Sequence, residues 1–500
     1  MNKQNNSSTE ILSSLSIKHK SQAIDRNTSR VICRLLMYGS DPVRIKSIVN
    51  RILRLDNNKV SELLDQVKKD FSDRHKDILA IFENHYKQVR GFISPADRNT
   101  FSEEQRLLIG AFFTMEYAIE SAALFNPSIV PHPDQSTAKE GELHFIMSLR
   151  AVGEGHISSI VFRSGMINSE GELLFEPSGS FVKTPMIENP VYRKRLFHNK
   201  LIEMQACDDV ARYILDRMPQ KFIYDELKEQ ITELSENPQF TPERQISCFK
   251  HMRQLADSDY QLKFEPDHQL SERVIFPVSD ESSGGLEDAR FVKFDYQDGG
   301  EDVYFATYTA YDGKTIMPQI IETHDFNEFR MNPLYGNAVR NKGMALFPRK
   351  IGGRYAMLSR QDGENNSIMF SERLHHWNHS EVIQSPTEYW EMVQLGNCGS
   401  PLETPEGWLV LTHGVGPMRT YSIGAILLNL ENPTKIIGRL KEPLLKPDKH
   451  TVIGYVPNVV YTCGAIIHNG HLVIPYAISD FQPAVASVEI DEVIGAMERY

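Results

Sequence analysis

The chain has 500 residues, of which 41% are hydrophobic and 24% charged, a composition typical of a soluble globular protein. Because a domain usually takes about 150 residues, we expect two or three structural units. The formal net charge of -12 at pH 7 argues against a nucleic-acid-binding surface, because such a surface needs clustered Lys and Arg to neutralise phosphates. Local basic pockets remain compatible with this balance.

The cysteines and the N-terminus indicate the compartment. The cysteines are odd in number and far apart, and none has the spacing of a metal site, so we expect a reducing environment and no bound metal. Residues 1–20 lack the apolar run of a secretory signal, and no later stretch holds the ~20 apolar residues of a membrane span. We therefore expect a cytoplasmic protein with no membrane partner. The five cysteines are Cys33, Cys207, Cys248, Cys398 and Cys463.

The N-terminal part of the chain is expected to be helical. Residues 1–25 are polar and rich in Ser and Asn, which predicts a loosely ordered tail. From residue 26 on, apolar residues recur every three or four positions, which predicts an α-helical domain over residues 26–135. Ser102, followed by two glutamates and an apolar run, is a plausible helix N-cap. Helical segments are expected at 31–39, 42–53, 59–71, 75–89 and 103–125.

Beyond this domain, a β-unit is interrupted by helices. Pro127, Pro131 and Pro133 mark a linker. Residues 140–188 contain short apolar runs separated by turns and are expected to be strands. Residues 189–257 return to helical periodicity, which predicts a helical insertion that could pack on the N-terminal helices.

The remaining residues, 258–500, are expected to be β throughout. Short apolar runs alternate with Gly, Asp, Asn and Pro turns, and a pattern of strand, turn and strand recurs along the chain. This recurrence predicts four-stranded blades around an axis. In such a propeller, polar groups that are far apart in the sequence converge at one end of the central channel.

The stretch SGGLEDAR, residues 283–290, is the first candidate for chemistry. Two glycines precede a Glu-Asp pair and an arginine, and a strand-like run follows, so a tight loop delivers charged groups to the mouth of a strand. Adjacent residues point in different directions. Either Glu287 or Asp288 therefore faces a ligand, while the other, or Arg290, braces it. A solvated turn with no ligand is the alternative.

Several ordered motifs extend this observation to a family. The stretches LEDAR, NKGMALFPRKIGGRYAMLSR, WEMVQLGNCGSPLETPEGWLVLTHGV, TYSIGAILLNL and GYVPNVVYTCGAIIHNGHLVIPYAISD resemble the β-mannoside phosphorylases and related β-mannosidases of glycoside hydrolase family 130. The resemblance covers residues 260–500 and the region 150–165. It implies an all-β five-bladed β-propeller catalytic domain, formed by 140–188 and 258–500. The α-helical N-terminal domain and the helical insertion are additions for which it implies no role.

The resemblance also implies roles for individual residues. Asp288 occupies the place of the family's general acid, which protonates the departing sugar oxygen, although Ala289 replaces the family's proline. Gln394 replaces a lysine that the phosphorylases usually carry, which removes one positive charge from the anion site. The residues at phosphate-contacting places are Lys342, Arg360, His413 and Tyr421.

Sugar hydroxyls are best held by carboxylates, amides and guanidiniums. Inorganic phosphate is expected as a co-substrate, with no cofactor and no metal. The expected substrate-binding residues are Asp480, Asn458, Arg150, Arg163, Glu287 and Arg290.

Three functions are open at this point. The first is an inverting β-mannoside phosphorylase that transfers a mannosyl group from a β-linked oligosaccharide to phosphate and yields α-mannose 1-phosphate. The second is an inverting β-mannosidase, favoured by Gln394, with Glu322, Glu364 or Glu403 as the base that activates water. The third is a non-catalytic sugar-binding propeller. The helical regions could in addition form a homo-oligomer interface.

Overall fold

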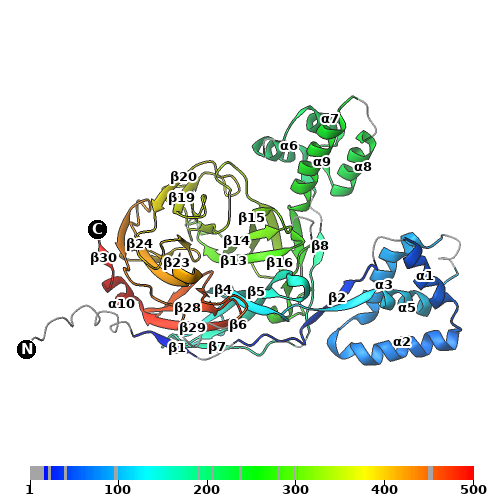
Figure 1. Ribbon diagram of the computed structural model, residues 1–500, viewed down its shortest axis with the longest axis horizontal. Coiled ribbons are helices and arrows are strands. Elements are labelled where there is room, and N and C mark those ends of the chain that lie inside the picture. The colour runs from blue at the N-terminus through cyan, green and yellow to red at the C-terminus, as the bar shows by residue number, and fades with distance from the viewer. Residues whose placement is uncertain are drawn as a thin grey trace, which may run out of the picture.

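Figure 1 shows the computed structural model of the chain. A round body of β-sheets carries two groups of helices on one side. The structure describes residues 16–20, 24–38, 42–94, 100–179, 181–188, 191–204, 206–235, 239–278, 282–297, 299–300, 302–448 and 454–500.

The first two antiparallel units of the round body are joined in one sheet. The link between them is a single parallel pairing of Gly285 with Ser158. The first unit contains β4 (Ala123–Pro131), β5 (Leu143–Val152), β6 (Ser158–Ile167), β7 (Leu173–Phe175) and β12 (Val274–Ile275). The second contains β13 (Gly285–Phe294), β14 (Val303–Tyr311), β15 (Ile316–Thr323), β16 (Glu328–Pro333), β11 (Tyr260–Lys263) and β8 (Met186–Glu188).

Three further sheets continue around the body (Figure 1). One contains β17 (Ala345–Leu346), β18 (Tyr355–Ser359), β19 (Asn366–Ser371) and β20 (Ser380–Gln384). The next contains β21 (Gln394–Asn397), β22 (Leu402–Thr404), β23 (Gly407–Val415), β24 (Tyr421–Leu428), β25 (Ile436–Arg439) and β30 (Glu498–Arg499). The last contains β26 (Val460–Tyr461), β27 (Ile466–His468), β28 (His471–Ile478), β29 (Gln482–Glu489) and β1 (Lys18–Lys20).

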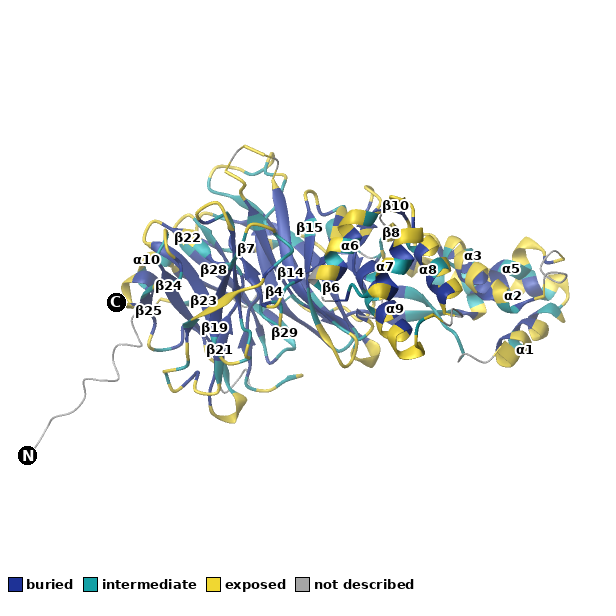
Figure 2. Cartoon of the chain, turned by 90° about the horizontal axis from the view of Figure 1, so that it is seen from above, coloured by how far each residue is buried: buried dark blue, intermediate teal, exposed yellow. Residues whose placement is uncertain are grey.

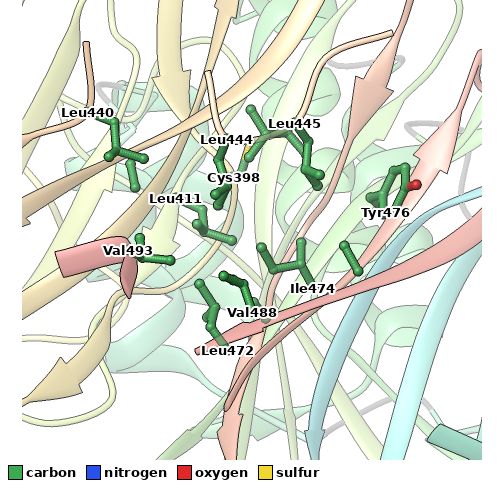
Figure 3. Close-up of a cluster of buried hydrophobic side chains, with 14 of the residues drawn as sticks. Cys398, Leu411, Leu440, Leu444, Leu445, Leu472, Ile474, Tyr476, Val488 and Val493 are labelled. Carbon is green, nitrogen blue, oxygen red and sulfur yellow. The ribbon is translucent and has the colours of Figure 1, made fainter. Parts of the chain in front are cut away.

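The sheets bury their apolar faces against one another, and the strands in the interior of the body are mostly buried (Figure 2). Figure 3 shows one such core, between the last two sheets and α10 (Ile490–Gly495). Cys398 lies in this core, where burial raises the pKa of its thiol to about 12. Its packing is therefore that of a small apolar side chain.

The N-terminal helices form a group with its own cores, lined by residues such as Val49, Tyr86 and Leu108. Ser102 is confirmed as an N-cap, because it accepts a hydrogen bond of 3.1 Å from Gln105 N and Gln105 Oε1 accepts one of 3.0 Å from Ser102 N. The helices are α1 (Pro42–Leu53), α2 (Asn57–Phe71), α3 (Ile78–Val89) and α5 (Glu103–Phe112).

Both ends of the expected helical domain 26–135 differ from the expectation. Residues 31–35 form β2 (Val31–Leu35), which pairs with β3 (Thr114–Ala118), and residues 123–131 form β4. The apolar spacing of residues 31–35 suits a strand as well as a helix, and pairing with β3 decides between them. The expected linker prolines Pro127 and Pro131 lie in β4.

Part of residues 1–25, which were expected to form a loosely ordered tail, is a strand. Lys18–Lys20 is a strand that pairs with β29 near the C-terminus, with Lys18 opposite Ser487. β1 thus adds a strand from near the N-terminus to the sheet that contains β29. Local composition does not predict such a long-range pairing. The rest of the expected tail, residues 1–15, lies outside the described residues.

The helical insertion packs on the sheets. Its core includes Tyr335, which follows β16, and no hydrophobic cluster of the described residues joins it to the N-terminal helices. The two groups are separate in Figure 1, so the expected packing between them is wrong. The insertion contains β9 (Tyr192–Arg193), α6 (Lys194–Glu203), α7 (Asp209–Arg217), β10 (Lys221–Phe222), α8 (Tyr224–Leu234) and α9 (Pro242–Asp257).

Within the described ranges, none of the helices combines the length and the apolar character that a membrane crossing requires.

Candidate active site

Two β-bulges bring Asn126 and Asp288 together. The pairing register of β4 shifts between Phe125 and Ser128, and that of β13 shifts between Glu287 and Arg290. Asn126 (φ 50°) and Asp288 (φ 54°) adopt the left-handed backbone conformation, which Asn and Asp tolerate better than most residues. Asn126 Nδ2 donates a hydrogen bond of 2.6 Å to Asp288 Oδ1. The bulges therefore aim both side chains out of their ladders toward one point.

Around this point lies a cavity of about 370 Å³. Every sheet of the round body contributes to its wall, through β4, β13, the segment before β17, β21 and the segment beside β26. It is lined by Asn126, Arg150, Asp288, Arg290, Asn341, Lys342, Gly343, Arg360, Gln394, Gly396, Asn397, His413, Arg419, Tyr421, Val459, Tyr461 and Asp480.

Asp288 lies among cations. Arg150 Nη1 is 3.4 Å from Asp288 Oδ1, and its Nη2 donates a bond of 2.7 Å to Glu287. Lys342 forms an ion pair with the other oxygen of Glu287. Burial alone would raise the pKa of Asp288, but Arg150, Arg290, the Asn126 hydrogen bond and Lys342 outweigh it and lower that pKa. The carboxyl is thus ionised in the free cavity, and Glu287 braces the two cations behind it.

Arg290 is held by neutral groups. Its Nη1 donates a hydrogen bond of 2.5 Å to Asn397 Oδ1, and its Nη2 donates one of 2.7 Å to the Tyr461 hydroxyl. No ion pair among the described residues involves Arg290. A fixed guanidinium without a carboxylate partner is a favourable contact for an anion.

Arg360 is also held by neutral groups. Its Nη1 lies 3.2 Å from His413 Nε2, and His413 Nδ1 lies 3.3 Å from the carbonyl oxygen of Asn397. Burial and the two arginines Arg360 and Arg290 hold the pKa of His413 well below its usual range. The imidazole is therefore neutral, with Nε2 accepting from Arg360 and Nδ1 donating to Asn397. His413 lines the cavity, but both its nitrogens are occupied in orienting Arg360.

Gln394 joins this group through hydrogen bonds. In the amide orientation that satisfies both side-chain atoms, its oxygen accepts from Arg360 Nη1 at 2.9 Å and from the Tyr421 hydroxyl at 3.2 Å, and its nitrogen donates to Gly363 O at 3.2 Å. The ring of Tyr421 stacks on His413 with centroids 5.8 Å apart. Gln394 thus fixes Arg360 and Tyr421 without adding charge.

Asp480 is the second carboxyl group among the lining residues of the cavity. It lies in the turn between β28 and β29, again with a positive φ of 48°. Burial and the charge of Asp288 raise the pKa of Asp480 to about 7, against the opposing effect of Arg150 and Arg419. The two carboxyl groups of the cavity therefore differ in protonation, since Asp288 is ionised where Asp480 retains a proton.

Most of the residues singled out from the sequence line this cavity, and Glu287 lies directly behind it. Two do not. Arg163 is buried and binds Glu120 at 2.8 Å, and it is not among the lining residues. Asn458 contributes its carbonyl oxygen to Tyr421 N at 2.9 Å, and its side chain does not line the cavity. The structure therefore does not bring these two residues into the cavity, since β6 turns Arg163 toward the core and the contact that Asn458 makes with Tyr421 is through its backbone.

Eight lining residues were not expected from the sequence, and five of them are polar: Asn126, Asn341, Asn397, Arg419 and Tyr461. Asn397, Arg419 and Tyr461 all lie within or beside the motifs quoted for the family, as polar groups between apolar strands, so that position alone could have indicated them. Asn126 lies between the segment 103–125, which was expected to be helical, and the expected linker proline Pro127. Only the bulge in β4 turns its side chain into the cavity.

The expected alternative bases lie elsewhere. None of Glu322, Glu364 and Glu403 lines the cavity, and Glu403 instead pairs with Arg349 at 2.6 Å. The described residues that could jointly hold a metal ion, Glu265, Asp267 and His268, do not line it either.

Comparison with known proteins shows the family to which this chain belongs. The glycoside hydrolase family 130 model, described as beta-1,4-mannooligosaccharide phosphorylase, matches residues 251–499. A 1,2-beta-oligomannan phosphorylase of Thermoanaerobacter sp. (strain X514) is 30% identical over 236 residues, which is 45% of this chain and 75% of the relative. A beta-1,2-mannobiose phosphorylase of the same organism is 31% identical over 251 residues, 48% of this chain and 77% of the relative. The chain belongs to glycoside hydrolase family 130.

A solved structure gives a weaker likeness. The beta-1,2-mannobiose phosphorylase from Listeria innocua, in complex with beta-1,2-mannobiose, aligns with a TM-score of 0.45 and 22% identity, over 76% of this chain and 92% of that one.

Proposed function

We propose that the chain is an inverting β-mannoside phosphorylase. The observation that carries this proposal is the charge pattern of the cavity. Arg290, Arg360 and Arg419 line it, and none of them takes part in an ion pair among the described residues. Among the described lining residues, the carboxylates are Asp288 and Asp480. Such a cavity attracts an anionic nucleophile and offers few groups that could activate water.

The reaction follows from these positions. Phosphate, held by Arg360 and its neighbours, attacks the anomeric carbon of a β-linked mannosyl group from the face opposite the leaving sugar. The new bond joins that carbon to a phosphate oxygen, the glycosidic bond to the leaving oxygen breaks, and the configuration inverts to α. The departing oxygen takes a proton from Asp288, directly or through a hydroxyl of the mannosyl group. The products are α-mannose 1-phosphate and the shortened sugar.

Asp288 has to acquire a proton before it can donate one. In the free cavity Arg150 and Arg290 lower its pKa. A bound phosphate brings negative charge beside these arginines and offsets their effect, so binding of phosphate and protonation of Asp288 are coupled. The nucleophile thus helps to prepare the acid.

The five antiparallel units then correspond to the blades of a five-bladed propeller, with the cavity at the end of its central channel. This arrangement accounts for the contribution of every sheet to one small site. The helical regions supply none of the lining residues.

Hydrolysis is the second candidate, and Gln394 is the observation that favours it, because its amide replaces a positive charge near Arg360. Water would need a carboxylate base across the sugar from Asp288. Asp480 is the remaining carboxylate of the cavity, and it retains its proton up to a pH of about 7. A carboxylate with this pKa can act as a general base at neutral pH, so the arginines without ion-pair partners among the described residues are what favour phosphate over water.

The reverse reaction tests the proposal. We would incubate the protein with α-mannose 1-phosphate and a panel of acceptor sugars, measure the release of phosphate, and determine the linkage of each product. We expect phosphate release only with an acceptor, and a β-linked product. No release with any acceptor, together with release of free mannose from β-mannobioses, would favour the hydrolase instead.

A further inference from the structure

A second basic cavity lies between the helical insertion and the sheets. Its volume is about 490 Å³, larger than that of the catalytic cavity, and the two share no lining residue. One wall comes from the insertion and the other from β16 and the turn between β19 and β20 (Figure 1 shows the insertion beside β15 and β16). The lining residues are Val191, Tyr192, Arg193, Leu196, Phe197, Asn199, Lys200, Asp259, Arg330, Asn332, Tyr335, Arg373, His375 and His376.

Cations face each other across this cavity. Arg193 and Lys200 lie on the insertion, and Arg330 and Arg373 lie on the sheets. Lys200 is paired with Asp259 at 3.0 Å, whereas no described carboxylate pairs with Arg193 or Arg330. The chain as a whole is acidic, with a net charge of -12, yet four cationic side chains surround the single carboxylate of this cavity, Asp259. Their mutual repulsion is unfavourable unless an anion occupies the space between them.

The floor of the cavity holds polar groups without partners. Asn332 is 3% exposed, and its Nδ2 donates to no group among the described residues. Arg330 and Asn332 are two residues apart on β16, so both side chains project from the same face of the strand. His375 Nδ1 is also buried, and no hydrogen-bond partner for it lies in the described part of the chain. Buried polar groups of this kind are normally satisfied by a ligand or by water.

The type of ligand follows from these groups. Guanidiniums on both walls suit a phosphoryl dianion, which they can bind in a bidentate manner. An amide and an imidazole on the floor suit hydroxyl groups, and the volume lies within the range of small-molecule sites. We propose that this cavity binds a phosphorylated sugar and thereby fixes helix α6 against the sheets. The inference does not depend on the catalytic function, because it rests on residues outside the catalytic cavity.

The phosphoryl group could come from a sugar phosphate or from free phosphate, and calorimetric titration distinguishes them. The probes are α-mannose 1-phosphate, inorganic phosphate and mannose. For the wild type we expect two bound molecules of α-mannose 1-phosphate per chain, and one in Arg330→Ala or in Arg360→Ala, the latter being the catalytic-cavity variant. The double variant should bind none. Equal affinity for inorganic phosphate at the insertion site would assign it to free phosphate, and would overturn the sugar part of the proposal.

Two more variants test whether misfolding, rather than loss of a ligand contact, explains weaker binding in Arg330→Ala. Arg193→Ala removes an exposed cation from the opposite wall, so it should weaken binding in the Arg360→Ala background at least about tenfold, as Arg330→Ala does. Arg212→Ala, an exposed arginine on α7 outside the cavity, should leave the affinity unchanged. Binding of α-mannose 1-phosphate in that background should also raise the melting temperature. No binding in the Arg360→Ala background, or binding that neither Arg193→Ala nor Arg330→Ala weakens, would overturn the proposal, whether or not the protein is a phosphorylase.

Discussion

Asn126 donates a hydrogen bond of 2.6 Å to Asp288, and each residue lies in a β-bulge of the strand nearest the cavity in its own sheet unit. Asp288, the proposed acid, is therefore positioned by two separate units. Since Asn126 donates to the ionised form of Asp288, it is one of the causes of the lowered pKa of that carboxyl. The bond thus sets both the position and the protonation of Asp288.

Asn126→Gly should shift the pH dependence of catalysis. Glycine keeps the positive φ without strain and removes the amide, so the pKa of Asp288 rises. The alkaline limb of kcat/KM, which reports the acid in the free enzyme, should move to higher pH, and kcat/KM at the optimum should fall about tenfold. Asn469→Gly, at another positive φ on the surface, is the control. An unmoved alkaline limb in Asn126→Gly would show that Asp288 is not the titrating acid.

Arg360→Ala should act mainly on phosphate. The variant loses a guanidinium that His413 and Gln394 orient and that no carboxylate neutralises. The KM for phosphate should rise about 10- to 100-fold, while the KM for the mannoside changes much less. Steady-state kinetics with each substrate varied in turn measures both constants. Arg354→Ala, an exposed arginine that stacks on Phe370, should change neither. Equal effects on both substrates would place Arg360 outside the phosphate site.

Asp480→Asn should change how stability depends on pH. The pKa of Asp480 is raised to about 7 in the folded protein, so between pH 4 and 7 the folded state binds more protons than the unfolded state. Its contribution to stability is present below pH 4 and is lost as the pH rises toward 7. Asparagine cannot ionise, so the variant should gain on the order of 2 kcal/mol relative to wild type between pH 4.5 and pH 8.

Urea unfolding at the two pH values measures this difference. Asp73→Asn, at an exposed position, is the control for removal of one negative charge. A constant difference between wild type and Asp480→Asn across this range would contradict the raised pKa.

Most of the residues singled out from the sequence line one cavity, whereas several of the helices and strands around it were predicted wrongly. Asp288, Arg360, His413 and Tyr421 were singled out through the family resemblance of the motifs that contain them, and all four line the cavity. Asn126 was missed because a bulge, which local periodicity does not reveal, turns it into the cavity.

Pairing between distant strands accounts for the other differences. Residues 31–35 have apolar spacing that fits a helix, and only pairing with β3 makes them the strand β2. The prolines of residues 127–131 predicted a linker, and only pairing with β5 shows that this segment is part of β4. The register in which β6 pairs with β5 directs the side chain of Arg163 into the core, where it binds Glu120. These relationships depend on contacts far apart in the chain.

The most direct test of the central claim is product analysis. We would incubate the protein with β-1,2-, β-1,3- and β-1,4-linked mannobioses, with and without inorganic phosphate, and follow mannose 1-phosphate and free mannose separately by NMR. The account predicts α-mannose 1-phosphate that forms only with phosphate, and a loss of about 1000-fold or more in Asp288→Asn. Free mannose released at the same rate without phosphate would contradict it.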